Sequence, residues 1–175
     1  KAIGIDTWGV DFGLFDKNGR LLGNPYHYRD TRTNGMIDYA DQTIGKKYIF
    51  EKTGIQFNFF NTLFQFMAMR KEQDPTLDIA DKMLFMPDIF NYLLTGVMKN
   101  EYSIASTSQL LNVKTKQWDK ELMEKAGIPA DIFGDIVMPG TVIGELSDDL
   151  CEELGCPKIP VIAVGSHDTA SAVAS

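Results

Sequence analysis

Three neighbouring polar residues, Ser166, His167 and Asp168, follow a strongly apolar stretch near the end of the chain. Residues 160–164 read Pro-Val-Ile-Ala-Val and end at Gly165, a pattern that predicts a strand buried on both faces of a sheet. From Ser166 onward, small residues and helix formers predict a tight turn followed by a helix. Because ligands bind outside the carboxyl ends of strands in open α/β sheets, Asp168 is a candidate general base.

Asp168 also has a purely structural interpretation. A carboxylate in the first turn of a helix commonly satisfies free backbone N–H groups, and the local pattern alone favours that role. A hydrolytic triad of Ser166, His167 and Asp168 is excluded, because three consecutive residues cannot align a nucleophile, a base and an orienting carboxylate. The sequence around Ser166 is not a G-x-S-x-G elbow either.

Composition narrows the class of protein. The 175 residues are 44% hydrophobic and 23% charged, which is typical of one folded domain with its own core. The net charge of −7 argues against a nucleic acid or an anionic membrane as partner. No stretch resembles a membrane-spanning segment or a cleavable signal, so we expect a cytoplasmic protein.

Because no initiator Met precedes Lys1 and the chain ends inside a predicted helix, we expect residues 1–175 to be part of a longer protein.

The first part of the chain predicts a strand, a break and a hairpin. Residues 3–5 start a strand, and alternating apolar residues over 10–15 continue it to a turn at Asn18-Gly19. Residues 21–28 should then extend the sheet. Gly9 interrupts the apolar pattern between the two strand segments, which marks either a bulge or a close approach of the backbone to a ligand. The pattern favours neither.

Helical spacing and end signals predict several helices further along. A capping box at Thr62-Leu63-Phe64-Gln65 opens one, and its Met and Phe stripe is interpreted as core. Residues 101–111 fit a helix or a loop equally well. Other helices are predicted over residues 36–43, 75–82, 86–94, 118–126 and 147–154, with a turn and strand over 139–144. The order of sheet, helices and sheet indicates an α/β fold.

Two arginines, Arg29 and Arg32, flank Asp30 in a loop before the first predicted helix. They could clamp a polar substrate. Exposed Arg and Asp neighbours more often pair with each other or with water, so the sequence slightly favours an internal ion-pair cluster.

A set of motifs in a fixed order resembles the FGGY family of carbohydrate kinases over essentially all 175 residues. Each motif alone is weak, and their order and spacing together are specific. The motifs are Asp6-Thr7-Trp8-Gly9-Val10-Asp11-Phe12, residues 28–33, 54–57, 86–88, 94–96 and 105–110, Trp118-Asp119, residues 139–144, and residues 166–173. The resemblance implies a ribonuclease-H-like or actin-like α/β domain, with a mixed sheet flanked by helices. Residues 1–175 then correspond to most of the sugar-binding N-terminal domain of a two-domain kinase.

The resemblance also implies an activity and a site. Members of the family phosphorylate a sugar hydroxyl with ATP and Mg²⁺. Asp168 resembles the catalytic base, His167 and Thr169 its sugar-binding neighbours, and Gly9 the point where a hairpin touches the sugar. Phosphoryl transfer needs one ionised carboxylate to take the proton of the attacking hydroxyl, which agrees with this role for Asp168.

Other parts of the site are not fixed by the resemblance. The family's first phosphate-binding hairpin and its nucleotide-binding domain should lie outside these residues, so we expect the 175 residues alone to be inactive. Sugar contacts by Gln56, Asn61, Arg29 or Arg32 stay open. The motifs at 6–11 and 167–172 resemble the branch that acts on L-rhamnulose. The alternatives are another ketose or deoxyketose kinase, such as one acting on L-fuculose, and a non-catalytic sugar-binding module. The sequence does not indicate an oligomeric state.

Overall fold

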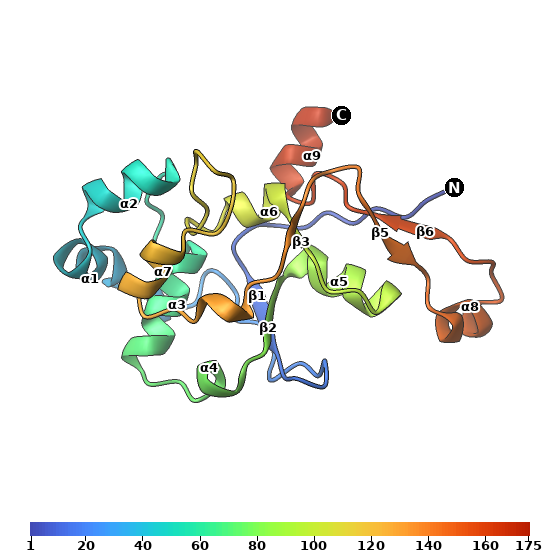
Figure 1. The fold of residues 1–175 in the computed structure, drawn as a ribbon, viewed down its shortest axis with the longest axis horizontal. Helices are drawn as coiled ribbons and strands as arrows, with labels where there is room; N and C mark the ends of the chain where they lie inside the picture. The colour runs from blue at the N-terminus through green and yellow to red at the C-terminus, as the bar shows by residue number, and fades with distance from the viewer.

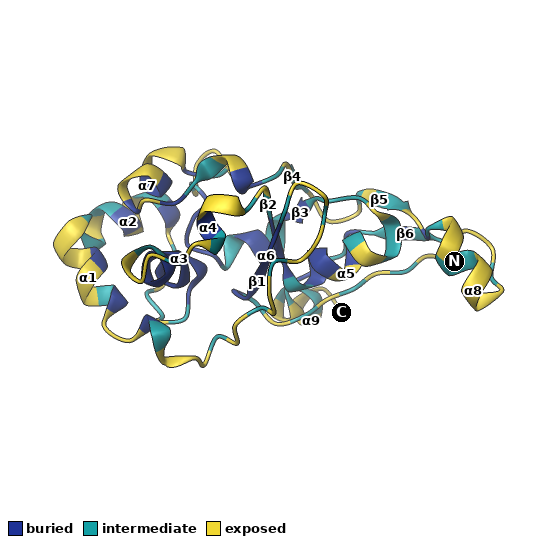
Figure 2. Ribbon diagram, turned by 90° about the horizontal axis from the view of Figure 1, so that it is seen from below, coloured by how far each residue is buried: buried dark blue, intermediate teal, exposed yellow.

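A computed structural model describes all 175 residues. The molecule is elongated, and most of its helices lie at one end (Figure 1). The other end holds the two-stranded sheet of β5 (Val142–Glu145) and β6 (Pro160–Ile162), with the connecting helix α8 (Asp148–Leu154) at its tip. Strands β1 (Phe12–Phe15) and β2 (Lys82–Phe85) and helix α5 (Met86–Thr95) lie between these ends. One apolar cluster of 24 buried residues forms the main core, and the buried residues concentrate toward the helical end (Figure 2). None of the helices combines the length and the apolar character needed to cross a membrane.

The central pair of strands is antiparallel. Strand β1 (Phe12–Phe15) pairs with β2 (Lys82–Phe85), and all four β1 residues are buried. The hairpin predicted at Asn18-Gly19 is confirmed, because Gly19 has φ 74° and Leu21 pairs with Phe15. The predicted extension of the sheet to residue 28 is wrong, since residues 22–28 form no strand or bridge.

Helix α3 (Thr62–Lys71) lies at the centre of the main core. It is buried from Thr62 to Met69, and the ring of Phe66 stacks on that of Phe12 at 4.3 Å. The predicted Met and Phe stripe is therefore core. The predicted capping box is wrong, because Asn61 is the N-cap, the Thr62 hydroxyl donates to Val10 O, and Gln65 Nε2 donates to Phe60 O. These side chains bond backbone carbonyls before the helix, so the helix start has no side-chain cap, and Leu63 N donates instead to Ser108 O at 3.0 Å.

Most predicted helices form where their end signals placed them. The structure has α1 (Met36–Thr43), α5 (Met86–Thr95), α7 (Lys120–Lys125) and α8 (Asp148–Leu154), with Asp119 and Ser147 as caps of the last two. Helix α2 (Lys46–Thr53) was not predicted. The helix predicted over 75–82 is wrong beyond α4 (Thr76–Ile79), because Lys82 already belongs to β2. A short, buried apolar run does not distinguish strand from helix by periodicity.

Short elements complete the fold. Two 3₁₀ turns (Thr31–Thr33 and Ala130–Ile132), helix α6 (Tyr102–Ser106) and helix α9 (Asp168–Ala174) accompany four further strands. Strand β3 (Asn100–Glu101) runs parallel to β4 (Ile136–Val137), whereas β5 (Val142–Glu145) is antiparallel to β6 (Pro160–Ile162). The predicted segment 101–111 is thus strand, helix and loop in turn. Both strand orientations occur, as a mixed α/β arrangement requires.

The extended N-terminal segment lies beside β6 and the turn that follows it. Ile3 pairs with Val161 and Thr7 pairs with His167, both in parallel orientation. Val161 and Ala163 are fully buried, but residues 162 and 164 are only partly buried. The prediction of a strand buried on both faces is therefore wrong for one face. Helix α5 packs against β5 and β6 and covers the face on which Val161 is buried.

Buried Asp88 on α5 makes stability depend on pH. Its carboxylate accepts hydrogen bonds from Glu101 N at 3.2 Å and from Asn100 Nδ2 at 3.3 Å. Burial raises the pKa of Asp88 well above its usual range, so between the usual and the raised pKa the folded state binds more protons than the unfolded state. The contribution of Asp88 to stability therefore decreases as pH rises through that window.

We expect the stability of an Asp88→Asn variant, relative to wild type, to increase as pH rises above about 4. The amide cannot ionise, so it does not carry the wild type's growing penalty for a buried charge. Urea unfolding of both proteins at a series of pH values measures the difference. A difference that stays flat with pH would contradict the role of Asp88.

Candidate active site

A cavity of about 350 Å³ brings the predicted site residues together. Gly9, His167 and Asp168 all line it, although they lie at opposite ends of the sequence. Trp8 and Val10 flank Gly9 in the lining, and the other lining residues come from three further segments: Tyr28, Ile55 with Asn58, Phe60 and Asn61, and Thr107. Thr169 does not line the cavity. Its backbone N–H and hydroxyl donate to Asp168 Oδ1 at 2.6 and 3.2 Å, so it supports the carboxylate.

Backbone hydrogen bonds place Asp168 at the cavity. Thr7 N donates to Ser166 O at 3.0 Å, and Asp168 N donates to Thr7 O at 2.8 Å. The residue is the first of α9, where the helix dipole stabilises a negative charge. Its side chain is 55% exposed, and His167 Nε2 lies 3.4 Å from Oδ1. All of these side-chain contacts go to Oδ1, so Oδ2 is free to accept a proton or a hydrogen bond.

A tight turn forms the opposite wall. Val10 has φ 67°, and Asp11 N donates across it to Gly9 O at 2.9 Å, the pattern of a γ-turn with a positive central φ. This conformation is strained for a β-branched residue. The Thr62 hydroxyl and Gln65 Nε2 donate to Val10 O at 2.7 and 3.3 Å and hold the turn in place. Such strain at a cavity wall points to a functional constraint.

Gly9 is next to the strained position but is not strained itself. Its φ lies outside the left-handed region, and no strand ladder surrounds it, so the bulge interpretation is wrong. A Cβ atom at Gly9 would lie 3.1 Å from both Oγ1 and Cγ2 of Thr107. The glycine therefore serves close packing between two walls of the cavity.

Buried Asp11 fixes the aromatic side of the cavity. Its Oδ2 accepts from Trp8 Nε1 at 2.7 Å and from Tyr28 N at 3.1 Å, and both of these residues line the cavity. Burial raises the pKa of Asp11, and the two hydrogen bonds oppose this effect. Trp8 is 40% exposed. Sequence reasoning missed this pair, although the spacing of an indole and a carboxylate three residues apart was visible.

Of the four residues whose contact with the sugar the sequence left open, one lines the cavity and three do not. Asn61 lines the cavity, but its Nδ2 donates to Gln56 O and Gln109 Oε1, both at 2.9 Å. Gln56, Arg29 and Arg32 do not line it.

The ion-pair cluster favoured for the two arginines and Asp30 does not form. Arg32 Nη2 donates to Gln65 Oε1 at 2.6 Å, and its guanidinium lies 4.0 Å from the ring centre of Tyr26. Arg29 Nε donates to the Tyr28 hydroxyl. Asp30 instead accepts from the backbone N–H of Arg32 at 2.8 Å and caps the first 3₁₀ turn. Local capping has replaced the expected charge pairing.

The site contains one carboxylate base candidate and no assembled metal centre. No group of three or more His, Cys, Asp or Glu side chains is placed to hold a metal ion. The amide groups of residues 167–169 at the start of α9 already donate to Ser103 Oγ, Thr7 O and Asp168 Oδ1. These residues therefore do not form a cradle for the phosphates of MgATP. The arrangement fits proton abstraction from a hydroxyl of a small polar ligand.

Comparison with known proteins places this geometry in context. The model of the FGGY family of carbohydrate kinases, N-terminal domain, matches residues 1–174. The rhamnulokinase of Bacteroides thetaiotaomicron is 48% identical over 174 residues, which are 99% of this chain and 36% of the relative. That of Mannheimia succiniciproducens is 47% identical over 174 residues, 99% of this chain and 34% of the relative. The chain spans about a third of the length of these relatives.

Solved structures share the fold at lower identity. Gluconate kinase from Lactobacillus acidophilus has a TM-score of 0.85 at 20% identity, covering 93% of this chain and 33% of the kinase. Plasmodium falciparum glycerol kinase with ADP has a TM-score of 0.82 at 20% identity, covering 94% of this chain and 33% of the kinase. The predicted actin-like, ribonuclease-H-like α/β fold is thereby confirmed.

Proposed function

The chain belongs to the FGGY family of carbohydrate kinases, and on that premise we propose that the full protein phosphorylates L-rhamnulose with MgATP, giving L-rhamnulose 1-phosphate. The observation that supports this most directly is the free Oδ2 of Asp168, on a cavity that Gly9 and His167 also line. The identity of 46–48% to rhamnulokinases favours this sugar over others.

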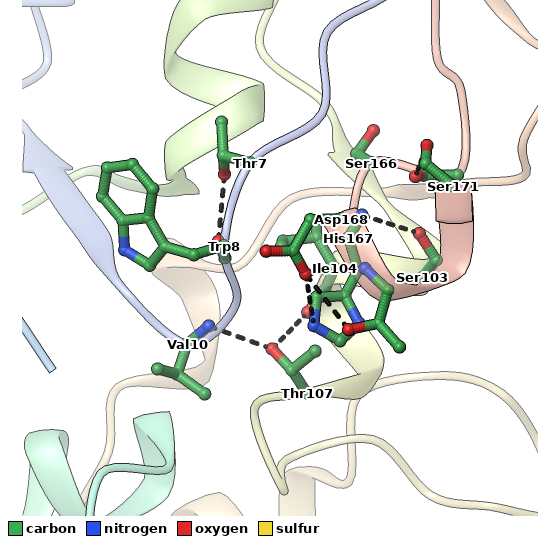
Figure 3. A network of polar contacts seen from close by, with 12 residues as sticks. Thr7, Trp8, Val10, Ser103, Ile104, Thr107, Ser166, His167, Asp168 and Ser171 are labelled. Atoms are coloured by element: carbon green, nitrogen blue, oxygen red, sulfur yellow. Dashed lines mark hydrogen bonds and ion pairs between the residues drawn. The ribbon is translucent and has the colours of Figure 1, made fainter. Parts of the chain in front are cut away.

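The proposed reaction uses Asp168 as general base. As the primary hydroxyl oxygen of the sugar attacks the γ-phosphorus, Oδ2 takes the hydroxyl proton, and the bond from that phosphorus to the bridging oxygen breaks to release ADP. His167 and Gly9 hold the sugar, and Thr169 holds the carboxylate through Oδ1. Figure 3 shows the second oxygen of Asp168 pointing away from His167, toward the side of Trp8 and Val10.

MgATP supplies the phosphoryl group, and the proposal assigns its binding to residues outside this chain. The residues described here offer neither a metal-binding cluster nor free amide groups at the start of α9. We accordingly expect no ATP turnover by the 175 residues alone.

A sugar panel with the full-length protein and ATP tests the proposal. We expect ADP release to be fastest with L-rhamnulose and at least about tenfold slower with L-fuculose, D-xylulose and glycerol, the margin that one misplaced polar contact gives. Fastest turnover with another ketose would replace the substrate but keep the reaction. Sugar binding without ADP release from any substrate would favour the non-catalytic module.

Trp8 offers a direct reporter of sugar binding. We expect L-rhamnulose to change the tryptophan fluorescence of the full-length protein, because a ligand in the cavity excludes water from an indole that is 40% exposed. The change should be lost in Trp8→Phe and kept in Trp118→Phe. Trp118 serves as the control because its indole packs against Phe85 and Phe133 in the core and does not line the cavity. An equal fluorescence change in wild type and Trp8→Phe would contradict the proposal that the sugar binds in this cavity.

A further inference from the structure

A buried carboxylate, Glu101, lies behind the wall of the cavity that carries Asp168. It is 0% exposed, and the four donors to its oxygens are all uncharged. They are Ser103 N at 2.8 Å, Ser103 Oγ at 2.5 Å, Ile104 N at 3.0 Å and Ser166 N at 3.2 Å. A carboxylate removed from water without a basic partner is costly, so its presence calls for a role that an apolar residue cannot fill.

The donors to Glu101 belong to two segments that are distant in sequence. Ser103 and Ile104 form the first turn of α6, which Glu101 caps. Ser166 belongs to the turn that leads into α9. Ser103 adds a second link, because its hydroxyl donates to Glu101 Oε2 and accepts from His167 N at 3.2 Å. Two consecutive amides of the turn before Asp168 are therefore held by one carboxylate and the hydroxyl bound to it.

The residue that follows α6 contacts the opposite wall of the same cavity. The Thr107 hydroxyl donates to Ile104 O at 2.7 Å and accepts from Val10 N at 3.1 Å. Figure 3 shows this line of contacts from Val10 through Thr107 to Ile104, together with the contact between Ser103 and His167. Helix α6 thus bridges the turn beside Gly9 and the turn before Asp168.

We infer that Glu101 and Ser103 are positioning residues that set the place of Asp168 relative to the sugar. This inference rests on the proposed function. The Asp168 carboxylate is held within its own segment only by His167 and Thr169, so its distance from Gly9 follows the backbone of residues 166–168. A base displaced by about 1 Å from the attacking hydroxyl can lose about 10²-fold in rate.

Ser103→Ala in the full-length protein tests the inference with little disturbance of the fold. The variant keeps the three backbone donors to Glu101 and loses the hydroxyl, which donates to Glu101 Oε2 and accepts from His167 N. We expect kcat with L-rhamnulose to fall about tenfold, the effect of one lost hydrogen bond, while the KM for ATP stays within about twofold. Ser103→Thr keeps the hydroxyl and should recover most of the turnover.

Ser106→Ala is the matched control. It removes a serine hydroxyl from the same helix, one that donates to Ser103 O at 2.7 Å and does not touch residues 166–168. We expect it to keep wild-type kcat at a melting temperature similar to that of Ser103→Ala. Glu101→Gln should lower kcat further, but it also disturbs a buried group. The comparison of Ser103→Ala with Ser106→Ala is therefore the test of the positioning role.

The outcomes separate the positioning role from the proposed function. A wild-type protein without sugar-dependent ADP release overturns both. An active wild type in which Ser103→Ala and Ser106→Ala retain equal kcat overturns the positioning role alone. The same holds if Ser103→Ala loses turnover only in proportion to a lower melting temperature, or if Ser103→Thr is no better than Ser103→Ala.

Discussion

Replacing Asp168 with Asn in the full-length protein is expected to lower kcat by about 10²- to 10⁴-fold, the usual contribution of a positioned general base. The amide has nearly the same shape and can still accept the Thr169 hydrogen bonds through its oxygen. It cannot take a proton from the attacking hydroxyl. Sugar-dependent ADP release gives kcat, and thermal melting checks that the fold is kept.

The control for this variant addresses the structural interpretation of Asp168. Asp149 is an exposed carboxylate in the first turn of α8, far from the cavity, so Asp149→Asn removes a helix-start charge and nothing else. We expect wild-type kcat from Asp149→Asn. If Asp168→Asn also kept near wild-type kcat and showed only a comparable small shift in melting, Asp168 would be a helix-start carboxylate without a catalytic role.

Gly9→Val is expected to raise the KM for the sugar by about 5- to 150-fold, the range that corresponds to about 1–3 kcal/mol of overpacking. The first atom of the new side chain would already lie 3.1 Å from Thr107, and its branches must displace Thr107 or enter the cavity that both residues line. The KM for ATP should change less than about threefold, since the proposal places the nucleotide on residues outside this chain.

Gly23→Val provides the comparison for Gly9→Val. Neither glycine has a φ in the left-handed region, and a Cβ at Gly23 meets nothing within 4 Å, so this variant reports only the general effect of a glycine-to-valine change. We expect it to keep both KM values. A Gly9→Val protein that melts normally and binds sugar normally would remove Gly9 from the sugar site. Equal increases in both KM values would indicate a general disturbance of the fold.

Local signals predicted the parts of this fold whose causes are local. Helices α5 and α8 end at Gly96 and Gly155, both with positive φ, and such C-terminal glycines are visible in any sequence. Strand β2 was missed because its pairing with β1 depends on residues about 70 positions away. The capping box failed for the same reason, since a distant carbonyl, that of Val10, took the Thr62 hydroxyl.

The candidate site shows the same division. The motifs around Gly9 and Asp168 predicted two walls of the cavity, and the structure brings both together. Sequence reasoning placed the unusual backbone at the glycine, whereas the positive φ lies at Val10 and is held by side chains from other segments. Glu101 gave no signal at all, because one Glu in a hydroxyl-rich stretch has nothing in its pattern that indicates burial.

The parallel pairing of Thr7 with His167 has a consequence for the order of folding. One wall of the cavity is made by residues 8–10 and another by residues 167 and 168, so closing the cavity requires a loop that runs from residue 10 to residue 167. Contacts of such high sequence separation form late, after local helices and hairpins. On the ribosome, where the N-terminal part emerges first, the cavity cannot be complete until residue 168 has been synthesised. Until then Trp8 has no complete cavity to line, and a ligand that binds in this cavity has no site through which to stabilise a nascent chain.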